Sequence, residues 1–291
     1  MIRTKRKKVR KIDWIERIGY PLMYVVLILF SIYSIAPFIW AFILTLKDYD
    51  EIMGSLVNIW PRHPDFENYY TLFTQSIYPR WLLNSIVASL GYTLISVVLC
   101  SIAAYSFAMF NFRGRNKLFL FMMGSVLVPF TSIAIPLFIE MANFKLVNNL
   151  WALILPGAAN AFTIYYLILY IRSAVPRDLI DSARVDGCSE LGILFRIVLP
   201  VILPGLAAMI IVNFVSAWND FFWPLIILRT EDMYTVPVGL PTWNQFSGTS
   251  VQPVVNWQIT GAVVSVIPIL IIFAFGMSQF IKGITAGAVK E

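Results

Sequence analysis

Long stretches without charged residues alternate with short polar segments along this chain of 291 residues. A helix needs about 20 mainly apolar residues to cross the hydrocarbon core of a bilayer. The uncharged stretches reach that length six times, which predicts an all-α fold, a polytopic transmembrane helical bundle with six spans. The predicted spans cover residues 18–46, 81–112, 118–139, 146–171, 197–228 and 259–281.

The uncharged run before the last predicted span is longer than one span needs, because it extends from Met233 to Ile281. Its first part is rich in residues that favour turns, namely Pro237, Pro241, Asn244, Gly248 and Pro253. We therefore expect a loop ahead of residue 259.

Proline interrupts the later spans. Each proline removes a backbone donor and loosens its helix. In lipid, such breaks are tolerated only where neighbouring helices or a wet cavity satisfy the freed carbonyls. The pattern favours a packed bundle with moving parts over a lone anchor, and the residues concerned are Pro129, Pro136, Pro156, Pro204 and Pro268.

Composition and charge place the chain in a membrane and orient it. The chain is 59% hydrophobic and 13% charged, whereas about a quarter of a soluble globular chain is charged. Seventeen Lys and Arg lie on the side that holds both termini and five on the opposite side, so we expect cytoplasmic termini. Without the basic segment 1–17 the bias falls to nine against five and keeps its sign.

Several kinds of chemistry are excluded by the residue types present. No Gly–Lys pair occurs, so the chain has no Walker A loop for nucleotide phosphates. His63 is the only histidine, which excludes a His–Cys metal cluster and a Ser–His pair. We therefore expect no catalytic residue, no metal site and no cofactor on this chain.

The predicted cytoplasmic loop 172–196 forms a helix, a turn and a second helix. Pro176 suits the first turn of a helix over residues 177–186. Gly187 stops that helix where a left-handed residue is favoured, and the second helix begins near Ser189 and leads into the fifth span.

The first of these two helices is amphipathic. Its apolar side chains share one face and its acidic side chains another, with Leu179, Ile180 and Ala183 on the first and Asp178 and Asp181 on the second. Arg177 and Asp181 are four residues apart and can pair. The helix is too short to span a membrane. It either lies at the membrane interface or docks into a groove on another protein.

Four parts of the chain resemble one family. Residues 181–187, Asp-Ser-Ala-Arg-Val-Asp-Gly, followed by Ile-Val-Leu-Pro at 197–200, resemble the EAA loop of ABC-importer permeases. Residues 216–221 resemble the Trp-Asn-Asp-Phe element of carbohydrate permeases, and residues 281–290 resemble their C-terminal segment. With Tyr-Ser-Phe-Ala at 105–108, the resemblance covers residues 15–290 and is nearest to the maltose-permease small-subunit type. Asp181 and Ser182 stand where the family pattern has Glu and Ala, which leaves the pairing of Asp181 open.

The resemblance implies a type I ABC importer permease fold and a sugar importer in a bacterial or archaeal cell membrane. A permease domain would cover residues 18–283 and a cytoplasmic tail residues 284–291. Its partners would be a second permease subunit, two ATP-binding subunits that hold ATP and Mg, and an extracellular solute-binding protein. A glycerol-3-phosphate or other polyol importer is the alternative within the family. A channel or receptor would not carry such a loop. A membrane enzyme would show charged catalytic residues clustered at one membrane face, and the sequence shows none.

The resemblance also assigns roles to parts of the chain. ATPase coupling would fall to Arg177, Leu179, Ile180, Asp181, Ala183, Asp186 and Gly187. The tail residues Thr285, Ala286 and Gly287 would reach the interface of the ATPase subunits, unless the tail frays.

Two outer segments have open alternatives. A carboxylate near the outer end of a span is costly unless it faces protein or water. Two interpretations of residues 218–220 follow. They form a cavity wall or polar clamp, or they lie in the aromatic belt at the outer interface; the residues are Trp218, Asn219 and Asp220. In the loop before the last span, the resemblance suggests contact with the solute-binding protein. The alternative is a loop folded over the bundle with Trp243 buried. The residues concerned are Trp243, Asn244, Gln245 and Phe246.

Overall fold

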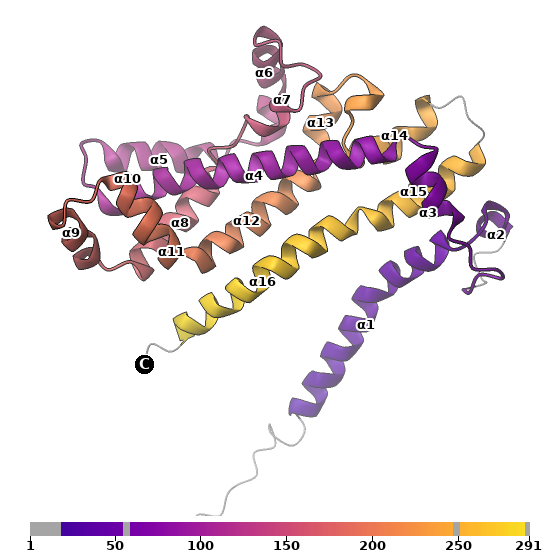
Figure 1. Ribbon diagram of the computed structural model, residues 1–291, viewed down its shortest axis with the longest axis horizontal. Helices are drawn as coiled ribbons and strands as arrows, with labels where there is room; N and C mark the ends of the chain where they lie inside the picture. Colours follow the sequence, from indigo (N-terminus) through magenta and orange to yellow (C-terminus); the bar gives the residue numbers. More distant parts are fainter. Residues whose placement is uncertain (1–18, 55–58, 247–250, 289–291) are drawn as a thin grey trace, which may run out of the picture. The chain divides into compact units, whose positions relative to one another are not determined.

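The computed structural model describes residues 19–54, 59–246 and 251–288 (Figure 1). The chain divides into two compact units, Met1–Phe66 and Glu67–Glu291. The predicted cytoplasmic segment 1–17 lies outside the described residues.

The described part of the first unit contains α1 (Tyr20–Thr45) and α2 (Tyr49–Gly54). Large apolar side chains are exposed along α1. Its two serine hydroxyls bond to carbonyls four residues back, Ser31 to Leu27 at 2.7 Å and Ser34 to Phe30 at 2.8 Å. Because both serine hydroxyls are satisfied within the helix and apolar side chains cover it, α1 is suited to an apolar environment.

The second unit is a helical bundle. α4 runs along it, packed against α8 and α12, and α12 also packs against α16 (Figure 1). The helices of this unit are α3 (Glu67–Thr74), α4 (Tyr78–Met109), α5 (Arg115–Ser125), α6 (Phe130–Asn143), α7 (Trp151–Ile154), α8 (Ala161–Ala174), α9 (Arg177–Val185), α10 (Glu190–Ile193), α11 (Leu199–Val201), α12 (Leu203–Trp218), α13 (Phe222–Ile227), α14 (Val236–Phe246), α15 (Val251–Val264) and α16 (Val266–Ala288). A π-helical turn, η2 (Leu194–Val198), and a 3₁₀ turn, η3 (Glu231–Met233), complete the described elements.

The all-α prediction is confirmed, but the spans are less regular than predicted. In the described residues, α1, α4 and the stretch Val254–Met277 are long and apolar enough to cross a bilayer. α5 and α6 together form a pair bent by 100°, and Glu190–Val201 with α12 a pair bent by 86°. The second bend falls where Ile202 precedes Pro204, and the first where Pro129 precedes α6.

The fourth predicted span, 146–171, is not one helix. α7 ends before Pro156, and Gly157 takes a positive φ of 75°. α8 then starts afresh, because the Asn160 side chain accepts a hydrogen bond from the Thr163 N–H at 3.0 Å and so caps the helix. The apolar helix that results has 14 residues.

The loop predicted ahead of residue 259 is wrong over most of its length, because α14 occupies Val236–Phe246 and α15 begins at Val251. Pro237 lies in the first turn of α14, where its missing N–H has no intrahelical partner to lose. α14 packs closely on α4, since a Cβ built on Gly239 would collide with the Trp81 ring.

Candidate functional site

The segment 172–196, for which the sequence predicts a coupling loop, folds as the predicted helix–turn–helix. α9 ends in two backbone hydrogen bonds of 3.0 Å, from the Gly187 N–H to the Arg184 carbonyl and from the Cys188 N–H to the Ala183 carbonyl. This Schellman arrangement needs a left-handed residue at Gly187, whose φ is +81°. The prediction that Gly187 ends the helix is therefore confirmed.

One face of α9 is buried against the bundle, and it is narrower than predicted. Ile180 and Ala183 are buried, whereas Leu179, expected beside them, is 41% exposed. Since 100° separates successive residues, Leu179 falls at the edge of the apolar stripe. Exposed residues of the opposite face line a shallow depression of about 490 Å³, namely Asp178, Asp181, Ser182, Val185 and Asp186.

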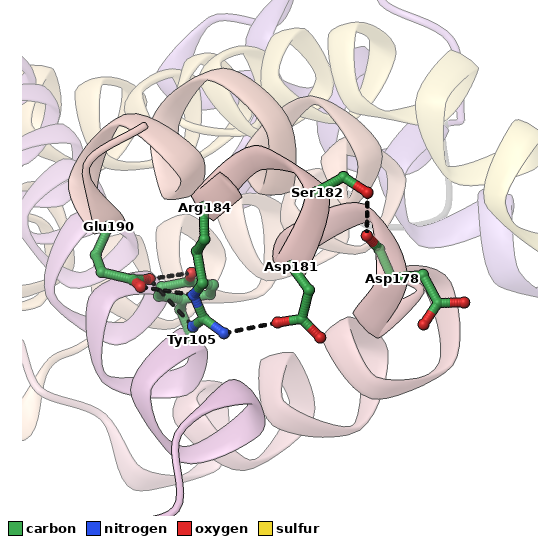
Figure 2. A network of polar contacts seen from close by, with 6 residues as sticks. All are labelled: Tyr105, Asp178, Asp181, Ser182, Arg184 and Glu190. Carbon is green, nitrogen blue, oxygen red and sulfur yellow. Dashed lines mark hydrogen bonds and ion pairs between the residues drawn. The ribbon is translucent and has the colours of Figure 1, made fainter. Parts of the chain in front are cut away.

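A polar network fixes α9 to α10 and to α4 (Figure 2). Arg184 donates from Nε to Glu190 Oε1 at 2.8 Å and from Nη1 to Asp181 Oδ1 at 2.9 Å. The Tyr105 hydroxyl of α4 donates to Glu190 Oε2 at 2.7 Å. The Arg184 guanidinium also lies over the Phe110 ring, 5.4 Å from its centroid. One arginine and one glutamate thus join three helices.

The charged forms of Arg184 and Glu190 stabilise each other. The hydrogen bond from Arg184 lowers the pKa of Glu190, and the same bond raises the pKa of Arg184. Because the side chains are 34% and 42% exposed, solvent screening limits the pair to about 1 kcal/mol. The network therefore fixes the orientation of α9 relative to α10 and α4 more than it stabilises the folded chain. It also gives Asp181 a partner, Arg184, in place of the expected Arg177.

A cavity of about 450 Å³ lies at the end of α12 remote from α9. Partly exposed residues such as Phe130 and Ser216 border it, so it opens to the surface of the chain. Aromatic, amide, hydroxyl and carboxylate groups line it, among them Tyr92, Phe130, Asn160, Ser216, Asp220 and Thr235.

The structure separates the three residues expected to act together near the outer end of the fifth span. Asp220 lines the cavity, and its Oδ1 accepts the Trp223 N–H at 3.4 Å. Trp218 is buried and stacks on Phe214, with ring centroids 5.6 Å apart. Asn219 is exposed and donates back to the Val215 carbonyl at 3.0 Å. Of the three, only Asp220 borders the cavity.

A polar clamp does hold the bundle together, one helical turn and a half before the residues expected to form it. Asn213 of α12 accepts from the Thr163 hydroxyl of α8 at 3.1 Å and donates to the Ser96 hydroxyl of α4 at 3.2 Å. The buried Cys100 thiol reaches the Asn160 carbonyl at 3.6 Å. All three clamp residues are buried, so each hydrogen bond matters.

Trp243 is a core residue rather than a docking residue. It is 3% exposed and packs against Trp81 and Trp257, with ring centroids 4.7 and 5.5 Å away. The expectation that its ring contacts a solute-binding protein is therefore wrong, because α14 turns the ring into the bundle. The side chains of Asn244, Gln245 and Phe246 lie outside the described residues.

The C-terminal residues Thr285, Ala286 and Gly287 continue α16, which runs to Ala288. Their side chains lie outside the described residues. A role at an ATPase interface stays a prediction.

Residues 96–286, which include the coupling loop and the cavity-lining end of α12, match the family of binding-protein-dependent transport system inner membrane components. The chain belongs to this family. It is thus a permease subunit and a multi-pass membrane protein.

Full-length relatives agree with this assignment. The permease is 35% identical over 279 residues to the arabinooligosaccharides transport system permease protein of Bacillus subtilis (strain 168), covering 95% of this chain and 96% of that protein. It is 32% identical to the lactose transport system permease protein of Rhizobium radiobacter, covering 92% and 95%. A bacterial ABC transporter involved in the import of the acidic polysaccharide alginate has the same fold, with a TM-score of 0.79, 22% identity and coverage of 96% of this chain and 100% of that chain.

Sequence reasoning missed four residues that the structure makes central: Arg184, Glu190, Asn213 and Thr235. A charged pair six residues apart across a glycine turn is a weak signal that could have suggested the first two. Asn213 could have been noticed as an amide inside an apolar span, which is costly without a partner. Thr235 carries no local signal, because its position depends on how α14 packs.

Proposed function

We propose that this permease is one of two membrane subunits of an ATP-driven, binding-protein-dependent oligosaccharide importer. A second, different permease chain would form the other half of the path. Two ATP-binding subunits would hold ATP and Mg²⁺ below it, and an extracellular solute-binding protein would deliver the sugar. Both termini and the coupling loop would face the cytoplasm, and this chain would carry no catalytic residue.

The observation that carries the proposal is the attachment of α9 to α4. An exposed acidic face on a short helix suits a groove lined with basic residues on an ATP-binding subunit. The Arg184–Glu190–Tyr105 network makes the helix one body with α4, so a push on α9 would move a membrane-spanning helix. Rigid-body transmission of this kind is a recurrent way of switching access.

The choice of an oligosaccharide rests on the relatives' substrates and on the charge of the cavity. None of the described residues that line the cavity is basic. A glycerol-3-phosphate importer would need Arg or Lys to hold the phosphate. A phosphorylated polyol is therefore less well supported than a sugar.

The test is reconstitution of the full complex in proteoliposomes with its binding protein and ATP. We expect ATP-dependent uptake of tritiated arabinotriose or lactose and no uptake of glycerol-3-phosphate. Co-purification of an ATP-binding subunit with the tagged permease is the first requirement. Uptake without any ATP-binding subunit would contradict the proposal.

A further inference from the structure

An arginine cluster lies where α5, α8 and α9 meet, at the end of the bundle that carries α9 (Figure 1). Arg115 is the first residue of α5, Arg172 lies in the last turn of α8, and Arg177 is the first residue of α9. α5 lies against α8, where the rings of Phe119 and Tyr165 have centroids 6.1 Å apart. Three positive side chains from three helices are thus brought together.

No carboxylate among the described residues forms an ion pair with this arginine cluster. Asp181 lies one turn after Arg177 on α9, but its carboxylate is bound by Arg184 at 2.9 Å. The pKa of Arg172, in the predicted loop 172–196, is held below its ordinary value, first by desolvation and then by the charges of Arg115 and Arg177. Like charges without a counter-ion repel each other, so an anion bound between them would stabilise the cluster.

The arginines keep donors for such an anion. Arg172 donates from Nη2 to the Phe107 carbonyl at 3.1 Å, which holds it against the end of α4. Arg115 donates from Nη1 to Asn111 Oδ1 at 2.9 Å. Each bond uses one of the five N–H donors of a guanidinium, and both acceptors are neutral. The remaining donors suit a phosphate group, which arginine binds through two parallel hydrogen bonds.

The surface beside the cluster has the chemistry that lipid chains require. Leu118 and Phe121 follow Arg115 at intervals of three residues along α5 and are 52% and 80% exposed. Leu169 precedes Arg172 by about one turn of α8 and is 49% exposed. Since residues three or four apart share a face of a helix, each of these two arginines stands at the end of an exposed apolar row.

The apolar rows decide between the possible anions. A free phosphate ion, or a carboxylate of an ATP-binding subunit, would use the arginines alone. An anionic phospholipid uses both features, because its phosphate pairs with the arginines while its acyl chains cover the apolar residues. Basic pockets between transmembrane helices bind phosphate headgroups in the same way.

We propose that the arginine cluster binds the headgroup phosphate of one anionic phospholipid, whose acyl chains lie along the exposed rows of α5 and α8. Because Arg177 begins α9, the bound lipid ties the start of that helix to α5 and α8. The site goes beyond the proposed function and does not depend on which solute is carried.

The experiment measures lipid binding by native mass spectrometry, on the full-length permease purified in a non-ionic detergent with the membrane subunits that co-purify with it. The probe is dioleoylphosphatidylglycerol. Dioleoylphosphatidylcholine, which has the same chains and no net charge, is the control lipid. We expect the wild type to retain phosphatidylglycerol in preference to phosphatidylcholine. Arg115→Gln and Arg172→Gln should each weaken phosphatidylglycerol binding about 5-fold, and the double variant should retain one molecule fewer than the wild type.

Lys117→Gln is the matched control, because it removes one positive charge from the same turn of α5. Residues two apart do not share a face of a helix, and the charge of Lys117 is not among those that act on Arg172. We expect this variant to bind phosphatidylglycerol as the wild type does.

Melting temperatures separate lipid binding from folding. Without added lipid, Arg115→Gln should melt no lower than the wild type, because the change relieves repulsion within the cluster. Added phosphatidylglycerol should raise the melting temperature of the wild type more than that of Arg115→Gln. An equal rise in both would contradict the site.

Three binding results would overturn the proposal: equal retention of the two lipids by the wild type, unchanged binding in the double variant, or an equal loss in Lys117→Gln. Displacement of phosphatidylglycerol by excess inorganic phosphate would show that the arginines bind a free anion. Its displacement by an added ATP-binding subunit would assign the cluster to a protein interface instead.

Discussion

Arg184 and Glu190 face each other across the glycine turn that ends α9, with Nε and Oε1 2.8 Å apart. The ion pair ties α9 to α10. The Tyr105 hydroxyl, which lies 2.7 Å from Glu190 Oε2, ties both helices to α4. The direction of α9 is therefore set by side chains and not by the turn alone.

Loss of this link should uncouple the transporter. Glu190→Ala removes the acceptor shared by Arg184 and Tyr105, so α9 is free to tilt relative to α4. We expect sugar uptake to fall severalfold more than binding-protein-stimulated ATP hydrolysis, with normal co-purification of the ATP-binding subunits. Glu140→Ala, which removes an exposed carboxylate of α6 away from both the network and the exposed face of α9, is the control for charge. Equal effects of the two changes would speak against a mechanical role.

The same pair gives a pH dependence with a defined sign. The pKa of Glu190 is below its ordinary value of 4.5 in the folded chain, because Arg184 hydrogen-bonds the carboxylate. Its contribution to stability is fully present above pH 4.5 and is lost as the pH falls through the lower folded-state pKa. The difference in melting temperature between the wild type and Glu190→Gln should therefore be constant from pH 7 to about pH 5 and shrink below that. A difference that grows on acidification would contradict the assignment.

Gly187→Val should damage coupling, because a β-branched residue resists the φ of +81°. Gly114→Val is the matched control, since Gly114 has a φ of +87° with open space around it and lies outside the coupling loop. We expect both variants to lose about 1–2 kcal/mol of stability. Only Gly187→Val should lose transport and stimulated ATP hydrolysis, measured in proteoliposomes. Full transport by that variant would exclude the turn from coupling.

Asn213→Ala should destabilise the bundle. It leaves the Thr163 and Ser96 hydroxyls buried without their shared partner, which costs about 1–3 kcal/mol. Asn219→Ala, at an exposed amide six residues later, should cost less than about 0.5 kcal/mol. Thermal unfolding of the purified complex compares the two. Similar melting temperatures for both variants would show that the clamp is not needed.

Local features of the structure could be predicted from the sequence, and long-range ones could not. α1 and α4 follow from uninterrupted apolar runs, and the end of α9 follows from Gly187, because in each case the deciding residues are neighbours. The bends after α5 and α11 were signalled by Pro129 and Pro204, but their angles depend on what the helices pack against. The sequence does not predict α14, because Pro237 and Pro241 favour turns, and only packing against α4 holds this segment as a helix.

The functional sites show the same division. The residues from Pro176 to Ser189 predicted the helix–turn–helix correctly. Its bond network needs Tyr105, 85 residues before Glu190 in the chain, and no periodicity links positions so distant. The cavity likewise depends on Thr235 meeting the end of α12, which only the packed bundle determines.

The two cysteines of the chain differ sharply in their surroundings. Cys100 is buried and its thiol contacts backbone carbonyls, whereas Cys188 is exposed immediately after the turn that ends α9. A thiol-directed fluorophore will therefore mark Cys188 and spare Cys100, because only the exposed thiol is accessible to it. The native protein thus carries a single labelling position beside α9, and occlusion of that position on addition of an ATP-binding subunit would report assembly without any engineered residue.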